Sequence, residues 1–369
     1  MSATSNEFVR DDQAPSEFSA SSESDSGQSY FRNSLEVLAI RPPSVEAGKL
    51  GDAFLRHYGL RGTIEVLSSE VEHTAEVVVP AGDHFILKTS PEPAALDSFR
   101  FQAAAMSALS NSTGFVVPQI RKTLDGTLTF EERGMCGYLQ RKLEGKPLHQ
   151  AAVSQDLLYR TGQALASLDS ALGSLDLPGM HRPVLWNIQC WPQLRELEEY
   201  VVLSPVADLV RSAIHEYADS IAHRLHDVSW QVTHNDPSPY NMLATDHGIA
   251  FIDFGDGGWG PRIQDLAIAA SHFVRDPGFA LGGAEYLIAG YSSVLPLSRR
   301  EAQLLVALVR ARQSALVLIN YWRSHLFPAD AAYIMKNVAR AEHGLSILAP
   351  LTTADAETAV LRAMNSAVR

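Results

Sequence analysis

The stretch THNDPSPYNM, residues 233–242, places a carboxylate and a carboxamide on a segment that contains two prolines. The two groups are those of Asp236 and Asn241. Pro237 and Pro239 lie between them, and each proline fixes its own φ and removes a backbone donor. The segment therefore cannot be helical. We expect a rigid loop that holds the carboxylate and the carboxamide in a defined relation.

Apolar, strand-like segments flank this loop. SWQVTHND leads into it, and GIAFIDFGD at 248–256 follows after the turn-forming sequence DHG. A tight connection of this kind brings the loop and the turn at Asp253 out side by side. Three oxygen-bearing side chains then converge, those of Asp236, Asn241 and Asp253, and hard divalent cations such as Mg²⁺ prefer such ligands.

The pattern His234-Asn235-Asp236, then Asn241, then Asp253-Phe254-Gly255 resembles the catalytic and metal loops of the kinase superfamily. Protein kinases usually carry Arg before the catalytic Asp, where this chain has Asn235. THNDPSPYNML and the later FIDFGDGGWGPRIQDLAIA are instead similar to the aminoglycoside phosphotransferase and choline kinase-like family, most closely to its hydroxylysine kinases. The resemblance extends over residues 50–345.

This resemblance implies a role for each polar residue of the two loops. Asp236 accepts the proton of the attacking hydroxyl, and Asn241 and Asp253 hold Mg²⁺ against the phosphates of ATP or GTP. His234 braces the loop, and Asp265 is the buried acid that hydrogen-bonds it. An Asp before Pro is also a common turn residue. The role implied for Asp236 therefore depends on the matching spacing of the two implied metal ligands, Asn241 and Asp253.

Lys88 ends the strand-like sequence HFILK, in which Ile86 and Lys88 share one face. An ammonium would then lie beside an apolar surface suited to a nucleotide base. A lysine at such a position often only faces solvent. The resemblance implies that Lys88 instead pairs with the nucleotide phosphates.

Two further segments are implied to contact the nucleotide. The phosphate-covering loop is expected at 68–74, ending at Thr74, in a sequence that lacks the glycines of protein kinases. The hinge is expected at 139–143, where the backbone of Arg141 and Leu143 contacts the base. Because backbone groups would make those contacts, ATP and GTP are both retained as donors.

The helix after Lys88 departs from the family pattern, which places a Glu there to pair with the lysine. LDSFRFQAAAM offers only Ser98, Phe99, Arg100 and Gln102 around that position. Asp97 or Glu92 could substitute for the missing acid. Alternatively, phosphate alone could position the lysine, since an ammonium beside a triphosphate is electrostatically compensated.

Acceptor residues are sought among polar and aromatic side chains near the two loops. Asp256 could face a substrate amine or only solvate its turn. Arg312 lies in an apolar helix and needs a partner when buried, either a substrate carboxylate or an internal acid such as Asp265, which we favour. Aromatic faces attract ammonium groups, although most large aromatics belong to the core. The candidates are Trp186, Trp191, Trp259, Tyr321 and Trp322, and Trp259 and Trp322 are retained for the acceptor site.

Composition narrows the class of protein. The chain has 369 residues and a formal net charge of −12, without a basic block, which disfavours nucleic acids and anionic membranes as partners. No run approaches the roughly 20 apolar residues that span a bilayer, and the first residues do not read as a targeting signal. Two cysteines cannot build a disulfide framework or a metal site. We therefore expect a cytoplasmic protein.

Changes in texture along the chain predict its organisation. Residues 1–34 are Ser-rich and acidic and are expected to be a disordered tail. Residues 35–144 read as a β-rich, nucleotide-binding N-lobe, and 145–369 as a helical C-lobe with the catalytic and metal loops. The expected fold class is α+β, a two-lobed protein-kinase-like fold.

The function that follows is Mg²⁺-dependent transfer of a nucleotide γ-phosphoryl group to the hydroxyl of a small, amine-bearing acceptor. Amino alcohols, hydroxy amino acids and aminoglycoside-like molecules fit this description. A catalytically silent, kinase-fold binding protein is the alternative, encouraged by the missing helix Glu. A metal hydrolase is disfavoured because further His or Asp clusters at ligand spacing are lacking.

Overall fold

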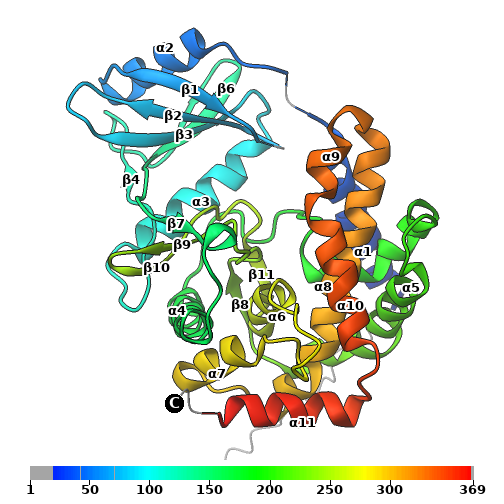
Figure 1. The fold of residues 1–369 in the computed structure, drawn as a ribbon. Helices are drawn as coiled ribbons and strands as arrows, with labels where there is room; N and C mark the ends of the chain where they lie inside the picture. The colour runs from blue at the N-terminus through cyan, green and yellow to red at the C-terminus, as the bar shows by residue number, and fades with distance from the viewer. Residues whose placement is uncertain (1–19, 42, 70, 367–369) are drawn as a thin grey trace, which may run out of the picture.

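The structure, a computed structural model, describes residues 20–41, 43–69 and 71–366. Figure 1 shows an N-terminal lobe built around a β-sheet and a larger C-terminal lobe built mainly of helices. The predicted fold class, a two-lobed protein-kinase-like fold, is confirmed.

Antiparallel strands form the N-lobe sheet, in the spatial order β1-β2-β3-β6-β4, with β5 also paired to β6. Their bounds are β1 Thr63–Leu67, β2 His73–Val78, β3 His84–Ser90, β4 Ile120–Arg121, β5 Phe130–Glu132 and β6 Met135–Arg141. Ala75 and Val77 alternate with more exposed neighbours in β2, because successive side chains of a strand point to opposite faces. They pack with Phe54 and Leu50 of helix α2 (Ala47–Tyr58) in a separate small core.

Helix α3 (Ala95–Leu109) lies between the sheet and the C-lobe (Figure 1). Phe99, Phe101 and Met106 of this helix are fully buried and belong to the same hydrophobic core as the C-lobe helices. Tyr138 of β6 packs edge-on against Phe99 at 5.6 Å. The helix is thus packed against both lobes, so its position relative to the sheet and to the C-lobe is fixed by apolar contacts.

Helices make up most of the C-lobe. The α-helices are α4 Gln155–Leu172, α5 Ala207–Glu216, α6 Ile263–Ser271, α7 Glu285–Val294, α8 Arg299–Leu326, α9 Ala331–Ile334, α10 Val338–Leu348 and α11 Thr353–Met364. Helices α4 and α7 cross closely because a glycine lies on each. A Cβ atom at Gly162 would lie 2.1 Å from the carbonyl oxygen of Leu287, and one at Gly290 would lie 1.9 Å from that of Tyr159.

Short strands under the N-lobe carry the polar loops. Strands β9 (Met242–Thr245) and β10 (Gly248–Phe251) form a hairpin that is extended by β7 (Lys146–Pro147). Strand β8 (Trp230–Thr233) pairs with β11 (Gly258–Pro261). The predicted strand at 248–256 is therefore shorter than expected and ends at Phe251, before the turn at Asp253.

The prediction of a disordered tail over residues 1–34 is wrong for 20–34, which lie in helix α1 (Ala20–Ala39). Phe31 is fully buried and Leu38 nearly so, and both belong to the C-lobe core. The Tyr30 hydroxyl donates to the carbonyl of Arg182 at 2.9 Å. Residues 35–39 therefore lie with the C-lobe, not the N-lobe. The first part of the predicted tail, 1–19, lies outside the described residues.

Two predicted C-lobe helices differ in type. Residues Ile188–Val201 form a 3₁₀-helix with Pro192 inside it. After α5 the chain makes a π-helical turn at Tyr217–Ile221 and then a 3₁₀-helix at Ala222–Asp227. Further 3₁₀ turns lie at Leu148–Gln150, Pro328–Asp330 and Met335–Asn337.

Helix α8 is the central helix of the C-lobe. It is long and apolar enough to cross a membrane by length and composition, and 83% of its most apolar window is buried inside the protein. A capping box at Ser298 and Glu301 fixes its start. This burial is that of a core helix.

Candidate active site

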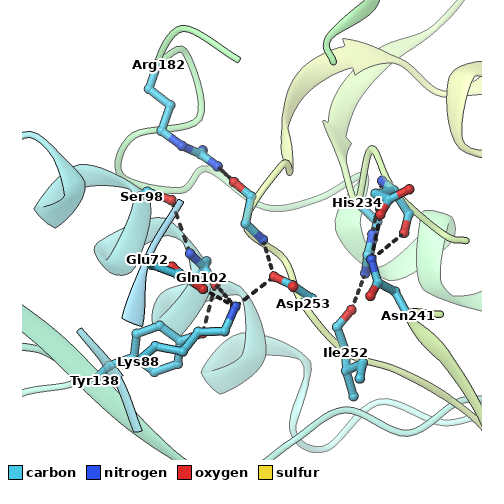
Figure 2. Close-up of polar contacts among 12 residues, drawn as sticks. Glu72, Lys88, Ser98, Gln102, Tyr138, Arg182, His234, Asn241, Ile252 and Asp253 are labelled. Carbon is cyan, nitrogen blue, oxygen red and sulfur yellow. Dashed lines mark hydrogen bonds and ion pairs between the residues drawn. The ribbon is translucent and has the colours of Figure 1, made fainter. Parts of the chain in front are cut away.

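Two short β-ladders position the loop that begins at His234. Strand β8 enters the loop and pairs with β11, whereas β9 leaves it and pairs with β10. The N–H of Ile252 donates to the carbonyl of Asn241 at 2.9 Å, which places the turn at Asp253 beside the loop. Figure 2 shows these residues together with Lys88 from the N-lobe.

His234 is buried and acts within the loop. Its Nε2 lies 3.1 Å from the carbonyl of Ile252, and its Nδ1 accepts the N–H of Asp236 at 3.3 Å. Burial lowers the pKa of His234 to about 4, so the ring is neutral with its proton on Nε2. The ring also packs 4.6 Å from that of Phe254. A neutral imidazole that is hydrogen-bonded through both ring nitrogens supports the loop, in keeping with the bracing role implied by the resemblance.

Asp265, on α6, anchors the start of the loop. Its carboxylate accepts the N–H of His234 at 2.6 Å and that of Asn235 at 2.7 Å. Asn235 has a φ of 62°, a conformation that most residues avoid, and these bonds hold it there. Burial raises the pKa of Asp265 to about 6. Asp169 of α4 lies beside it, and burial together with the Asp265 charge raises the pKa of Asp169 well above its usual range.

Asp236 has a partly buried carboxylate with three side-chain partners, one of which is Ser238 Oγ at 3.4 Å from Oδ2. Asn241 Nδ2 donates to its Oδ2 at 2.6 Å, and Arg312 Nη2 lies 3.4 Å from its Oδ1. Burial raises the pKa of Asp236 to about 8, although Arg312 opposes this shift. The prediction that Asp265 pairs with Arg312 is wrong: the internal acid at Arg312 is Asp236, because Asp265 is taken up by backbone amides of the loop.

Asp253 lies in the turn after β10 with a φ of 61°. Its Oδ1 accepts the N–H of Gly255 at 3.3 Å and lies 2.8 Å from Lys88 Nζ (Figure 2). Burial would raise the pKa of Asp253, but the Lys88 ammonium and these hydrogen bonds hold it below its usual range. The side chain remains 46% exposed, so the carboxylate is ionised and accessible.

Lys88 pairs with a carboxylate from the loop before β2. Its Nζ lies 2.5 Å from Glu72 Oε1 and 3.4 Å from Gln102 Oε1 of α3 (Figure 2). The expectation that Asp97 or Glu92 supplies the acid is wrong. A neutral amide occupies the helix position, and the loop supplies the charge. Buried among acids, Lys88 has a pKa held well above its usual range despite desolvation.

Gln102 connects this lysine to the rest of the N-lobe. Its Oε1 also accepts the Tyr138 hydroxyl at 2.8 Å, and its Nε2 donates to Ser98 Oγ at 3.1 Å. Tyr138 itself is directly opposite Lys88 in the β3–β6 register. The lysine is therefore held from the helix and from the loop.

Arg182 connects the turn at Asp253 to α3. Its Nη2 donates to the carbonyl of Gly255, and its guanidinium lies over the Phe101 ring at 4.6 Å. Its Nη1 donates to the carbonyl of Gly179 at 3.1 Å. Burial lowers the pKa of Arg182 to about 10, and it stays charged at neutral pH. Nothing in the local sequence marked this residue.

The donor set fits Mg²⁺. Asp253 offers an accessible carboxylate and Asn241 a carboxamide from the adjacent segment, and Mg²⁺ is commonly held by one or two such groups plus phosphate oxygens and water. Within the described ranges, the protein has no cluster of three or more His, Cys, Asp or Glu side chains suited to a metal. A cation here would thus depend on a nucleotide for its remaining ligands.

The other predicted nucleotide residues lie along the N-lobe sheet and hinge. Thr74 is directly opposite Lys88 in the β2–β3 register. The N–H of Arg141 donates to the carbonyl of Gln119 at 2.8 Å, so a backbone contact of this residue with a nucleotide base would use its carbonyl. Leu143 follows the strand, half-buried, and its N–H has no acceptor in the part of the chain that the structure describes.

Of the predicted acceptor residues, Trp322 lies in the core, whereas Trp259, Arg312 and Asp256 contact other aromatic or polar side chains. Trp322 is 7% exposed within the C-lobe core, so it does not face an open site. Trp259, half-buried on β11, lies 5.8 Å from the His181 ring. Arg312 lies under the Trp186 ring at 4.7 Å. The Asp256 carbonyl accepts from the Asn235 side chain, and its charge interacts with Arg312.

Two lobes, a loop carboxylate and a buried lysine beside an acidic turn define a phosphotransferase of the protein-kinase-like class. The chain belongs to the phosphotransferase enzyme family (APH), whose profile matches residues 63–297.

Curated relatives carry the name hydroxylysine kinase. The Danio rerio protein is 25% identical over 301 residues, which cover 76% of this chain and 84% of that protein. The Mus musculus protein is 26% identical over 219 residues, which cover 55% of this chain and 58% of that protein. The matched region thus spans little more than half of the mouse relative.

Solved structures share the fold at low identity. An amicoumacin kinase solved with AMP-PNP and Ca²⁺ superposes with a TM-score of 0.58 at 14% identity, covering 80% of this chain and 93% of that one. A microcompartment-associated aminopropanol kinase gives a TM-score of 0.58 at 19% identity, covering 84% and 98%.

Proposed function

We propose that this protein transfers the γ-phosphoryl group of ATP or GTP, with Mg²⁺, to the hydroxyl of a small, amine-bearing molecule. The observation that carries the proposal is the pairing of Asp236 with Asn241 at 2.6 Å beside an Asp253–Lys88 pair at 2.8 Å. In this proposal Asp236 is the base, Asn241 and Asp253 are cation ligands, and Lys88 is the phosphate-binding ammonium. The names of the relatives, and the nucleotide analogue bound by a structural neighbour, support it.

Residues of both lobes would bind the donor. Lys88 donates to the phosphates, and Asn241 and Asp253 would hold Mg²⁺, which supplies positive charge against the phosphate oxygens. Thr74 lies opposite the lysine, and the N–H of Leu143 would donate to the nucleotide base. Because Lys88 already has acidic partners, the phosphates are expected to replace the contact that it now makes with Asp253.

Asp236 would act on the acceptor. Its carboxylate orients the hydroxyl and takes its proton as the acceptor oxygen bonds to the γ-phosphorus. The bond between the γ-phosphorus and the oxygen that bridges it to the β-phosphorus breaks, and the nucleoside diphosphate leaves with the electron pair of that bond. Ordering both reactants in one site supplies most of the rate, since phosphoryl transfer depends on positioning and charge stabilisation.

The acceptor side would involve Asp256, Trp259 and Arg312 near Asp236. An ammonium of the acceptor is expected beside the Asp256 carboxylate, with an aromatic face contributing cation–π attraction. Trp322, predicted with them, is part of the core and is not included. Glu72 removes the main reason to consider a catalytically silent protein, because it supplies the acid that the helix lacks.

Both cysteines, Cys136 and Cys190, are buried free thiols. Burial raises the pKa of Cys136 to about 11 and that of Cys190 to about 12, so both are unreactive thiols at neutral pH. Free thiols fit the reducing cytoplasm expected from the sequence.

A substrate screen tests the function. Release of nucleoside diphosphate is followed with Mg²⁺-ATP or Mg²⁺-GTP over amino alcohols, hydroxy amino acids, aminoglycosides and neutral sugars. We expect turnover of an amine-bearing acceptor, loss of turnover on chelation of Mg²⁺, and a fall in turnover on the order of a hundredfold or more for Asp236→Asn. Turnover of neutral sugars alone would reject the amine. Equal nucleotide binding with and without Mg²⁺ would reject the metal roles of Asn241 and Asp253.

A further inference from the structure

Arginine side chains gather on the face of Asp236 that is turned toward α8 and α10. The group consists of Arg275, after α6, Arg312 on α8 and Arg340 on α10, together with the His272 ring, and is called the arginine cluster below. Helices α8 and α10 pack against each other and lie side by side in Figure 1.

Contacts between backbones and side chains bring these segments together. Gln313, next to Arg312, donates to the carbonyl of Ser271 at 3.2 Å, and the His343 ring of α10 lies 3.1 Å from the carbonyl of Arg275. Arg312 reaches Asp236 at 3.4 Å. The cluster is therefore continuous with the carboxylate that we assign as the base.

Several donors of the cluster have no acceptor among the residues that the structure describes. Arg312 is 4% exposed, yet its Nε and Nη1 are unpartnered. Arg340 Nε is also buried without a partner, as are both ring nitrogens of His272, which is 3% exposed. Across residues 20–41, 43–69 and 71–366, neither Arg275 nor Arg340 lies within ion-pair distance of a carboxylate.

The charges of the cluster repel one another. Burial first, and then the nearby charges of Arg275 and Arg312, lower the pKa of Arg340 to about 10, with Tyr240 and Asp236 opposing. Burial and all three arginines hold the pKa of His272 well below its usual range, so this ring is neutral. Buried donors that lack acceptors are costly, and Arg312, Arg340 and His272 bring several such donors together in a chain of net charge −12. An anion between them would remove the cost.

We propose that the arginine cluster binds a carboxylate of the acceptor. A guanidinium matches a carboxylate in shape and charge, and the cluster lies next to the base rather than beside Lys88, where the donor phosphates belong. The inference rests on the proposed function and narrows it. The acceptor is a hydroxy amino acid, with its hydroxyl at Asp236, its amine near Asp256 and its carboxylate at Arg340 and Arg312.

Matched acceptors that differ only by a carboxylate test the inference in the parent protein. The pairs are 5-hydroxylysine with 1,5-diaminopentan-2-ol, threonine with 1-aminopropan-2-ol, and homoserine with 3-aminopropan-1-ol. We expect kcat/KM to favour the carboxylate member of the best pair by on the order of tenfold to a hundredfold, the usual effect of one charge-assisted hydrogen bond. Glycerol 3-phosphate tests a phosphate as the anion instead.

Arg340→Gln tests the residue, because within the described part of the chain Arg340 has no hydrogen-bond or ion-pair partner whose loss would disturb the fold. The variant should lose on the order of tenfold or more in kcat/KM for the carboxylate member relative to its amino-alcohol counterpart, chiefly through KM, and Arg340→Lys should lose less. Arg362→Gln, an exposed arginine on α11, removes the same charge away from the site and serves as control.

Each outcome separates the inference from the proposed function. Turnover of the amino alcohols without preference for a carboxylate would overturn the inference and leave the amine-directed kinase standing. Preference for hydroxy acids that lack an amine would support the inference and reject the proposal that the acceptor carries an amine. An equal loss for both members in Arg340→Gln would assign Arg340 to the transferred phosphoryl group and overturn the inference, as would preference for glycerol 3-phosphate. Turnover of no acceptor would overturn both.

Discussion

Moving the acid that holds Lys88 from the loop to the helix provides a sharp test of the donor site. Glu72→Gln removes the charge that lies 2.5 Å from Lys88 Nζ, and Gln102→Glu places a charge on an atom now 3.4 Å from it. The two changes are nearly isosteric. They therefore alter where the negative charge is attached and little else.

The size of the effect follows from the contact. Lys88 is 5% exposed, so its bond to Glu72 is a largely desolvated, charge-assisted hydrogen bond, a type that contributes about 1.5–3 kcal/mol. Nucleotide binding by Glu72→Gln should weaken by about tenfold to a hundredfold. Gln102→Glu alone adds a third acid near the phosphates and should also weaken binding. The double variant should recover most of the loss, because Tyr138 can still donate to the new carboxylate.

Calorimetric titration with AMP-PNP and Mg²⁺ measures this directly, and the four proteins form a double-mutant cycle. Glu65→Gln, an exposed acid-to-amide change on β1, is the matched control. The reasoning would be refuted if Glu72→Gln bound the nucleotide as tightly as the parent, or if the double variant were no better than the product of the two single effects. Tighter binding by Glu72→Gln would mean that the carboxylate obstructs a phosphate position.

Three further outcomes are expected. Asp236→Asn should still bind AMP-PNP but lose turnover by on the order of a hundredfold or more, and parental turnover would reject the base. Since burial raises the folded pKa of Asp169, its stabilising protonation is present at low pH and is lost as pH rises; Tm of the parent should fall as the pH rises above about 4, the ordinary pKa of an aspartate, and Asp169→Asn should flatten that fall, which an unchanged slope would contradict. Deleting residues 1–19 should leave Tm unchanged, whereas deleting 1–39 removes buried Phe31 and should lower it by several degrees; equal Tm values would contradict the packing of α1.

The sequence could predict the two lobes and the polar loops because those signals are local. The spacing from His234 to Asn241, the two prolines and the hairpin that follows act over a few residues. The structure accordingly places Asn241 and Asp253 on adjacent segments. Their roles toward Mg²⁺, and that of Asp236 toward an acceptor, remain predictions.

The acid at Lys88 escaped prediction because the search followed the helix after the lysine. Register offers a better signal. Thr74 lies opposite Lys88 across β2 and β3, and a residue two positions away on the same strand lies on the same face, within reach of a long side chain. That diagonal neighbour is Glu72, although it lies just before the first residue of β2.

Helix α1 and the partner of Arg312 were missed for different reasons. The serines and acids of the first 30 residues outweigh the apolar stripe that begins at Tyr30 and Phe31, so average composition predicts disorder. Arg312 meets Asp236 across 76 positions of sequence, and only the packing of α8 against the loop selects this acid over others.

The contacts that hold the turn at Asp253 in place have a consequence for inhibitor design. Phe254 is fully buried against the His234 ring, and Arg182 holds the next carbonyl while resting on Phe101 of α3. A compound that needed to expel this phenylalanine to open a deeper cavity would have to break the arginine contact and disturb the packing between the lobes. Compounds that accept the turn as it stands face no such cost. Screening should therefore begin with molecules directed at the hinge N–H of Leu143 and the face of Lys88.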